Sequence, residues 1–126
     1  MKRYIFIIIM VAMSAGAAVY RVSPTNDVGS VMRKLRSGDK VIFSVGKYRQ
    51  RVVLNKIKGS EKSPVIIRGE KGAIIIPKEQ DGILVQNSEY INISGFEISG
   101  AWRAGILVFA SKYINCLLYT SPSPRD

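Results

Sequence analysis

The sequence predicts an all-β protein, a parallel β-helix (solenoid) fragment with a short N-terminal capping α-helix. The first observation is an internal repeat: GILVQNSEYIN (Gly82 to Asn92) aligns with GILVFASKYIN (Gly105 to Asn115) at an offset of 23 residues, with eight of eleven positions identical. A period in the low twenties suits a leucine-rich repeat or one coil of a parallel β-helix. The second observation is a series of β-branched triplets separated by Gly, Ser and Asn, without spaced leucines or intervening helices. These triplets favour the β-helix.

Length and composition limit the number of domains and the kinds of site that the chain can form. A chain of 126 residues that is 47% hydrophobic and 22% charged is predicted to form a single globular domain. The sequence contains no histidine, which excludes a histidine base and a histidine metal ligand. Between residues 18 and 115 there are sixteen basic and eight acidic residues, a net charge of +8, and no cysteine. A disulfide-stapled miniprotein is therefore excluded.

The N-terminus has the layout of a secretory signal peptide. Lys2 and Arg3 precede an apolar run from Tyr4 to Tyr20, which includes the sequence Ala15-Gly16-Ala17. A basic start, an apolar centre and an Ala-x-Ala site define such peptides, and the run is short of the roughly 20 residues that a membrane span needs. We therefore expect residues 1–17 to be a signal peptide and the protein to be secreted, periplasmic or on the cell surface.

A short amphipathic helix is predicted next. Asn26 or Asp27 is placed to cap a helix in which Val28, Val31, Met32 and Leu35 follow i, i+3, i+4, i+7 spacing, with Gly38 placed to end it. Because the sequence shows nothing upstream that would bury its apolar face, the helix is predicted to cover the open end of the coils.

Three strand ladders are predicted from the triplets. The first contains residues 41–43, 65–67, 91–93 and 113–114; the second contains 52–54, 74–76 and 96–98; the third contains 83–85 and 106–108. Side chains alternate between the two faces of a strand. We therefore expect Ile83, Val85, Ile106 and Val108 to point inward, and their neighbours Leu84, Gln86, Leu107 and Phe109 to face outward.

The C-terminal segment departs from this pattern. Residues 116–126 (CLLYTSPSPRD) contain the only cysteine, and resemble one translated reading frame of an adapter used in preparing sequencing libraries. They are predicted to be a read-through artefact. Because Asn115 interrupts a repeat halfway, residues 18–115 are expected to be the cap and first coils of a truncated β-helix domain.

The segment from Ser37 to Ile76 resembles a known family. Gly38-Asp39, Gly46-Lys47-Tyr48, and Gly59 with Pro64, each placed beside apolar strands, are similar to the opening of right-handed parallel β-helix proteins of the pectate-lyase-like superfamily. The resemblance covers nearly all of residues 26–115. It implies that the GILV strands mark the face where substrate clefts lie, and that catalytic residues lie on later coils.

The resemblance implies a carbohydrate-active protein, and the leading hypothesis is a polysaccharide lyase that cleaves uronate-containing glycans by β-elimination. A non-catalytic surface adhesin, and a glycoside hydrolase or depolymerase on the same scaffold, remain open as alternatives. These classes share the same opening coils. The fragment alone is expected to be inactive.

The predicted substrate-binding residues lie in two loops, 77–82 and 99–104. Lys78 and Arg103 are candidates to bind uronate carboxylates, and Trp102 is a candidate to stack on a sugar ring. The alternative interpretation is that Trp102 packs its loop and the two cations are solvated. Glu79 and Asp81 are oxygen ligands suited to Ca²⁺, but a single carboxylate pair is more often solvated, so no metal site is predicted here and Ca²⁺ remains open for the full-length protein.

Acidic polysaccharide is the expected partner. A basic stretch containing Arg49, Arg51, Lys56, Lys58 and Lys62 would steer a polyanion toward the protein. Nucleic acid is not expected, because the sequence has no recognition helix or aromatic sheet motif. After signal cleavage no membrane contact is expected, and the full-length protein is expected to be a monomer.

Overall fold

The computed structural model describes residues 17–77, 81–100 and 105–117. In chain order the elements are β1 (Val19–Val22), α1 (Val28–Met32), β2 (Lys40–Phe43), β3 (Gly46–Tyr48), β4 (Val52–Asn55), β5 (Val65–Gly69), β6 (Ala73–Ile75), β7 (Ile83–Gln86), β8 (Glu89–Ser94), β9 (Glu97–Ile98), β10 (Ile106–Phe109) and β11 (Lys112–Leu117).

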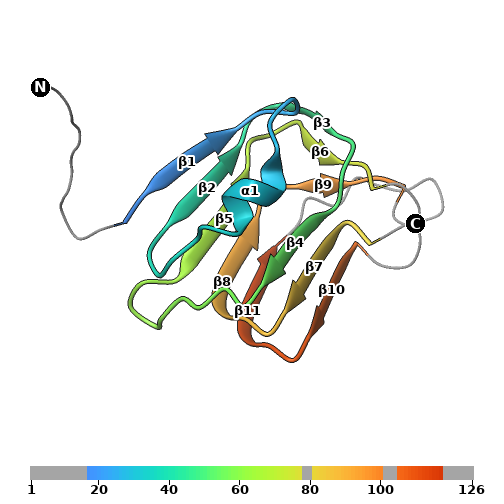
Figure 1. The fold of residues 1–126 in the computed structure, drawn as a ribbon. Helices are drawn as coiled ribbons and strands as arrows, with labels where there is room; N and C mark the ends of the chain where they lie inside the picture. Colours follow the sequence, from blue (N-terminus) through green and yellow to red (C-terminus); the bar gives the residue numbers. More distant parts are fainter. Residues whose placement is uncertain (1–16, 78–80, 101–104, 118–126) are drawn as a thin grey trace, which may run out of the picture.

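The strands stack into a parallel β-solenoid, as predicted (Figure 1). One sheet has the order β1-β2-β5-β8-β11, a second has the order β3-β6-β9, and a third has the order β4-β7-β10. Neighbouring strands in every sheet are parallel, and each coil contributes one strand to each sheet in turn. Consecutive coils therefore lie one on another, with the three sheets forming the sides of the stack.

The predicted register of the repeat is confirmed. Ile106 pairs with Ile83 and Val108 pairs with Val85 across the β7–β10 ladder. Ile83 and Val85 are fully buried members of the apolar core, whereas Val108, in the edge strand, is 38% exposed. The alternation also holds in the largest sheet, where Val65, Ile67, Ile91 and Ile93 are buried.

Aromatic side chains fill one corner of the core. The rings of Phe43 and Phe96 meet edge to face with centroids 4.7 Å apart, and the Tyr48 ring lies 5.1 Å from Phe43. The corner between β8 and β9 is tight: Gly95 has a φ of +85°, and a Cβ there would lie 2.2 Å from the carbonyl oxygen of Gly69. Only glycine fits both the conformation and the space.

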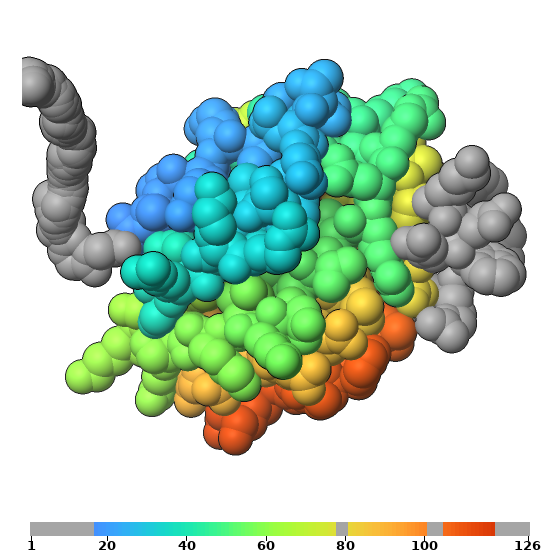
Figure 2. All heavy atoms as spheres, in the orientation of Figure 1, coloured from blue at the N-terminus to red at the C-terminus, as the bar shows by residue number. Residues whose placement is uncertain are grey.

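Helix α1 lies across the N-terminal end of the coils, as predicted (Figures 1 and 2). Val28 and Met32 are buried, and the helix contacts β4. Asp27 occupies the N-cap position without a side-chain capping bond. The helix is shorter than predicted: it ends at Met32, and Gly38 instead supplies a left-handed residue (φ +88°) in the loop that follows.

The Asp39 carboxylate ties that loop to the first strand. Its two oxygens accept hydrogen bonds of 2.9 Å from the backbone N–H groups of Ala18 and Arg36, and the residue is 2% exposed. Buried polar groups are kept in proteins when they are hydrogen-bonded in this way. The Gly38-Asp39 pair therefore fixes both the entry to β2 and the position of β1.

One strand assignment from the sequence is wrong. Residues 52–54 do not stack on 74–76; strand β4 pairs with β7, so that Val52 lies beside Ile83. The predicted pairing of 74–76 with 96–98 is confirmed by β6 and β9, and the strand on the other side of β6 is β3, which was not predicted. The physical reason is that β3 contains only Gly-Lys-Tyr, so its single buried side chain, Tyr48, carries no apolar pattern.

Strand β1 was not predicted. Its sequence VYRV directly follows the apolar N-terminal run, which hid its alternation, and it pairs along its whole length with β2. Strand β1 therefore adds a strand before the helix to the five-stranded sheet. At the other end, β11 continues through Cys116, which is exposed and pairs with Ile93, to Leu117.

Candidate functional site

The outward side of the β4-β7-β10 sheet, here called the outer face, is built from two rows of side chains set by strand register. One row is apolar and contains Val53, Leu84 and Leu107. Leu84 is only 8% exposed although it lies outside the apolar core cluster, and Val53 and Leu107 flank it on the neighbouring strands. The apolar row therefore forms the base of the outer face.

The second row is polar and aromatic. Asn55, Gln86 and Phe109 lie side by side on the three strands, and Phe109 is 48% exposed. Amide groups both donate and accept hydrogen bonds, and an exposed aromatic ring offers a flat apolar surface. Together these groups match the alternating hydroxyl and C–H surfaces of a sugar ring.

The turn after each strand holds this row in place. Lys56, Asn87 and Ala110 occupy equivalent left-handed positions with φ of 60°, 54° and 53°. The Asn87 side-chain amide donates a 3.2 Å hydrogen bond to the Oδ1 of Asn55 and so orients it.

Serines stabilise the same turn one residue later. Ser111 Oγ accepts a 3.0 Å bond from the Ser88 backbone N–H, and Ser88 Oγ accepts a 3.1 Å bond from the Ile57 N–H. Each hydroxyl also donates to a carbonyl of its own coil. This repeated bonding locks neighbouring coils at the edge of the outer face.

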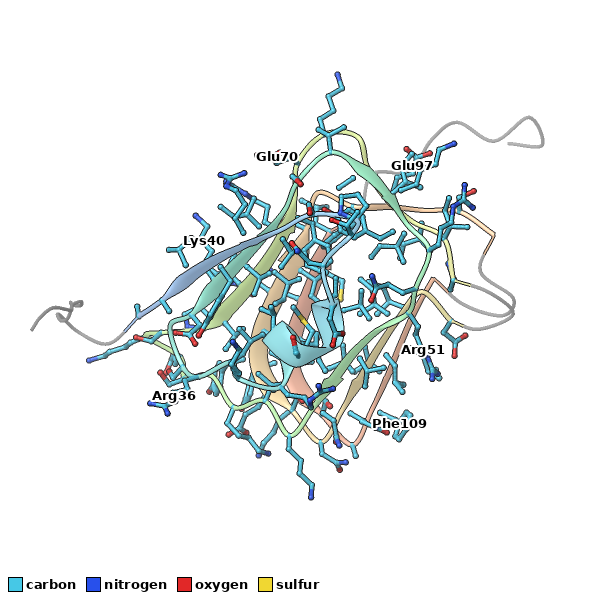
Figure 3. The ribbon with its side chains drawn as sticks, turned by 45° about the horizontal axis from the view of Figure 1, so that its top comes forward. Arg36, Lys40, Arg51, Glu70, Glu97 and Phe109 are labelled. Carbon is cyan, nitrogen blue, oxygen red and sulfur yellow. The ribbon has the colours of Figure 1, made fainter. Side chains whose placement is uncertain are left out.

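An arginine and a buried carboxylate lie where the β4 and β7 strands begin. Arg51 Nη2 lies 3.9 Å from Asp81 Oδ2, and the Asp81 side chain is 3% exposed. Asp81 is therefore not the solvated carboxylate that the sequence suggested. Figure 3 shows Arg51 and Phe109 pointing away from the coil on the same side of the molecule, while Lys40 and Glu70 lie on other sides.

The predicted substrate-binding residues Lys78, Trp102 and Arg103 lie outside the described residues, as does Glu79. Within the described ranges, no group of three or more acidic, histidine or cysteine residues could hold a metal ion. The same part of the chain contains no helix that is long and apolar enough to cross a membrane.

Sequence reasoning placed Gln86 and Phe109 on the outward side of their strands but did not assign them a role. Asn55 was missed because its strand was assigned to the wrong ladder. A shared side-chain type would have identified Asn55. Both Asn55 and Gln86 are amides that directly follow an apolar triplet and precede a residue in the left-handed conformation.

No protein-family model matches the chain, and no curated protein matches it. Among solved structures, the chain is similar to a mannuronic acid specific polysaccharide family 6 lyase from human gut microbiota, with 22% sequence identity and a TM-score of 0.51. The match covers 64% of this chain and 20% of the lyase, so the chain spans about a fifth of that protein's length. This likeness supports the parallel β-solenoid fold.

Proposed function

We propose that the chain forms the N-terminal cap and first coils of an exported polysaccharide lyase that cleaves uronate-containing glycans. The observation that carries the proposal is the row formed by Asn55, Gln86 and Phe109 on the outer face. Amides, an exposed ring and a nearby arginine, Arg51, are the groups that an acidic sugar needs for binding. The likeness to a mannuronic acid specific lyase supports this substrate class.

In β-elimination a base removes the C5 proton of the uronate, the freed electron pair forms the C4–C5 double bond, and the glycosidic C4–O bond breaks. The oxygen that leaves takes up a proton. A cation beside the carboxylate lowers the barrier because it stabilises the charge that develops there. Ca²⁺ would supply such charge, but the described residues do not form a site that fits it.

The part of this chain in the reaction is to bind and orient the polymer. Asn55 and Gln86 hydrogen-bond sugar hydroxyls, and Phe109 packs against a sugar ring. Lys78, Trp102 and Arg103 extend the same surface from the flanking loops in this proposal. The base belongs to coils that follow this segment, so the chain binds without cleaving.

The proposal is tested by calorimetric titration of the purified protein with a mannuronate oligosaccharide and with a neutral glucose oligosaccharide of equal length. We expect binding of the acidic sugar only. Phe109→Ala should weaken that binding about ten-fold, which is roughly 1.4 kcal/mol. Tyr113→Ala is the matched control, because Tyr113 is also an exposed aromatic residue (62%) but lies outside the outer face.

Equal binding of the neutral sugar, or an equal effect of the two variants, would overturn the assignment of the outer face. Cleavage is measured separately as the ultraviolet absorbance of the unsaturated product. We expect none from this chain and a clear signal from the uninterrupted gene product. Binding without cleavage by the longer protein would instead support the adhesin hypothesis.

A further inference from the structure

A groove separates helix α1 from strand β4 beside the outer face. Its volume is about 520 Å³, within the roughly 300–1,000 Å³ range of small-molecule sites. Met32 and Val53 contribute apolar lining, and the amides of Gln50 and Asn55 contribute polar lining. Asn55 also belongs to the amide row, so the groove and the outer face share a residue.

Arg51, which directly precedes β4, also lines this groove. Its Nε is buried and has no hydrogen-bond partner among the described residues. Its Nη2 meets Asp81 only at 3.9 Å, which is longer than a hydrogen bond. A buried guanidinium N–H without a partner is unfavourable, so the Arg51 side chain gains a hydrogen bond if it turns toward a ligand acceptor in the groove.

Arg33 and Asp27 add charge from the helix side. A Cβ placed on Gly29 would lie 3.3 Å from Arg33 Nη1 and 3.4 Å from Asp27 Oδ1, so both charged groups converge over that glycine. The groove is thus lined by two arginines and one carboxylate. The net charge of its lining is +1, which favours an anionic ligand.

We propose that this groove is a separate subsite for one carboxylated sugar of the polymer, held by Arg33 and Arg51. This inference rests on the proposed function and adds to it an anchoring point on the cap helix. An arginine pairs with a carboxylate through two parallel N–H···O bonds, whereas a neutral sugar offers no such partner. The amides of Gln50 and Asn55 lie within the same groove to bind hydroxyls.

The test measures the affinity of the purified protein and four variants for the mannuronate oligosaccharide. We expect Arg33→Gln and Arg51→Gln each to weaken binding about ten-fold. Asp27→Asn should strengthen binding about two-fold, because it removes the one negative charge. The change keeps a good N-cap residue, so the helix is expected to remain folded.

Arg68→Gln is the matched control. Arg68 is exposed on the outward side of the five-stranded sheet, and its loss lowers the protein's net charge by the same amount. We expect it to leave the affinity unchanged. If Arg51→Gln fails to fold, Arg33→Gln and Asp27→Asn still test the site with opposite expected signs.

The possible failures are distinguishable. If the unchanged protein binds neither oligosaccharide, the proposed function fails and the subsite fails with it. If the unchanged protein binds and Phe109→Ala weakens binding, but Arg33→Gln behaves like Arg68→Gln, only the groove assignment is wrong. Arg33 decides this point because it lines only the groove, whereas Arg51 also lies beside the outer face. An unchanged or weakened affinity in Asp27→Asn would also overturn it.

Discussion

Tyr48 illustrates how one residue stabilises the first coil. Its ring is fully buried, and its hydroxyl donates a 2.7 Å hydrogen bond to the Ser44 carbonyl oxygen and lies 3.1 Å from that of Val22. Burial raises the pKa of the phenol above its ordinary value of 10.0. The hydroxyl therefore contributes fully to stability only while the phenol stays protonated.

The pH dependence follows from that shift. Because the folded-state pKa lies above the unfolded one, this contribution is complete below about pH 10 and is lost as the pH rises toward the folded value. Tyr48→Phe should lower the unfolding free energy by about 1 kcal/mol at neutral pH. In denaturant titrations the difference between the two proteins should shrink above about pH 10. A difference that is constant with pH would contradict this account.

Gly95 has a backbone conformation that a larger residue is predicted not to tolerate. Its φ of +85° and its approach to Gly69 leave no room for a Cβ. Gly95→Ala should therefore destabilise the protein by about 2 kcal/mol or more. The control is Gly100→Ala, which has a similar φ of +75° but no atom within 4 Å. Thermal unfolding measures both variants. If the two substitutions lower the stability equally, the backbone conformation alone, and not the close packing on Gly69, matters at Gly95.

Helix α1 is an element that tertiary contacts hold in place. Five residues are too few for an isolated helix to be stable. Val28 and Met32 are buried while the helix makes no side-chain cap. Its stability therefore comes from covering the first coil.

Truncating the helix contact tests that conclusion. Met32→Ala should lower the unfolding free energy by about 2–5 kcal/mol, because Met32 is 1% exposed. Val31→Ala should have a smaller effect, since Val31 is only partly buried against the core. Denaturant unfolding measures both, and equal effects would argue against a capping role.

The ladders show what sequence pattern determines and what it does not. Residues 65–67 and 91–93 were assigned correctly because each is an apolar triplet in the longest ladder. Strand β4 was misplaced because it lies 31 residues from its partner (52 to 83), whereas Ile83 and Ile106 are 23 apart (83 to 106). A coil can gain residues in its loops without any change in its strands. A repeat length measured in one coil therefore does not predict strand partners in a coil with longer loops.

The candidate site was predictable only in part. The outward direction of Gln86 and Phe109 follows from alternation alone. The groove does not, because it arises where α1 packs near β4, and no local pattern states which strand a helix will contact. The loop residues Lys78, Trp102 and Arg103 stay predictions.

At the scale of the whole molecule, each coil supports the next. Inward residues form one continuous apolar core, and the Tyr90 and Tyr113 rings of successive coils stack with centroids 4.5 Å apart. The last described coil leaves Val108, Phe109 and Leu117 exposed. Coil stacking thus places Asn55, Gln86 and Phe109 in one row, and the proposed function depends on that register.

The most direct test of the stacked register is the measurement of nuclear Overhauser contacts between methyl groups of adjacent coils in solution. The account predicts contacts from Ile83 to Ile106 and to Val52, and from Val85 to Val108 and to Leu54. Contacts from Val52 to Ile74 instead, or none between Ile83 and Ile106, would contradict the stacked register and, with it, the proposed sugar-binding role of the row.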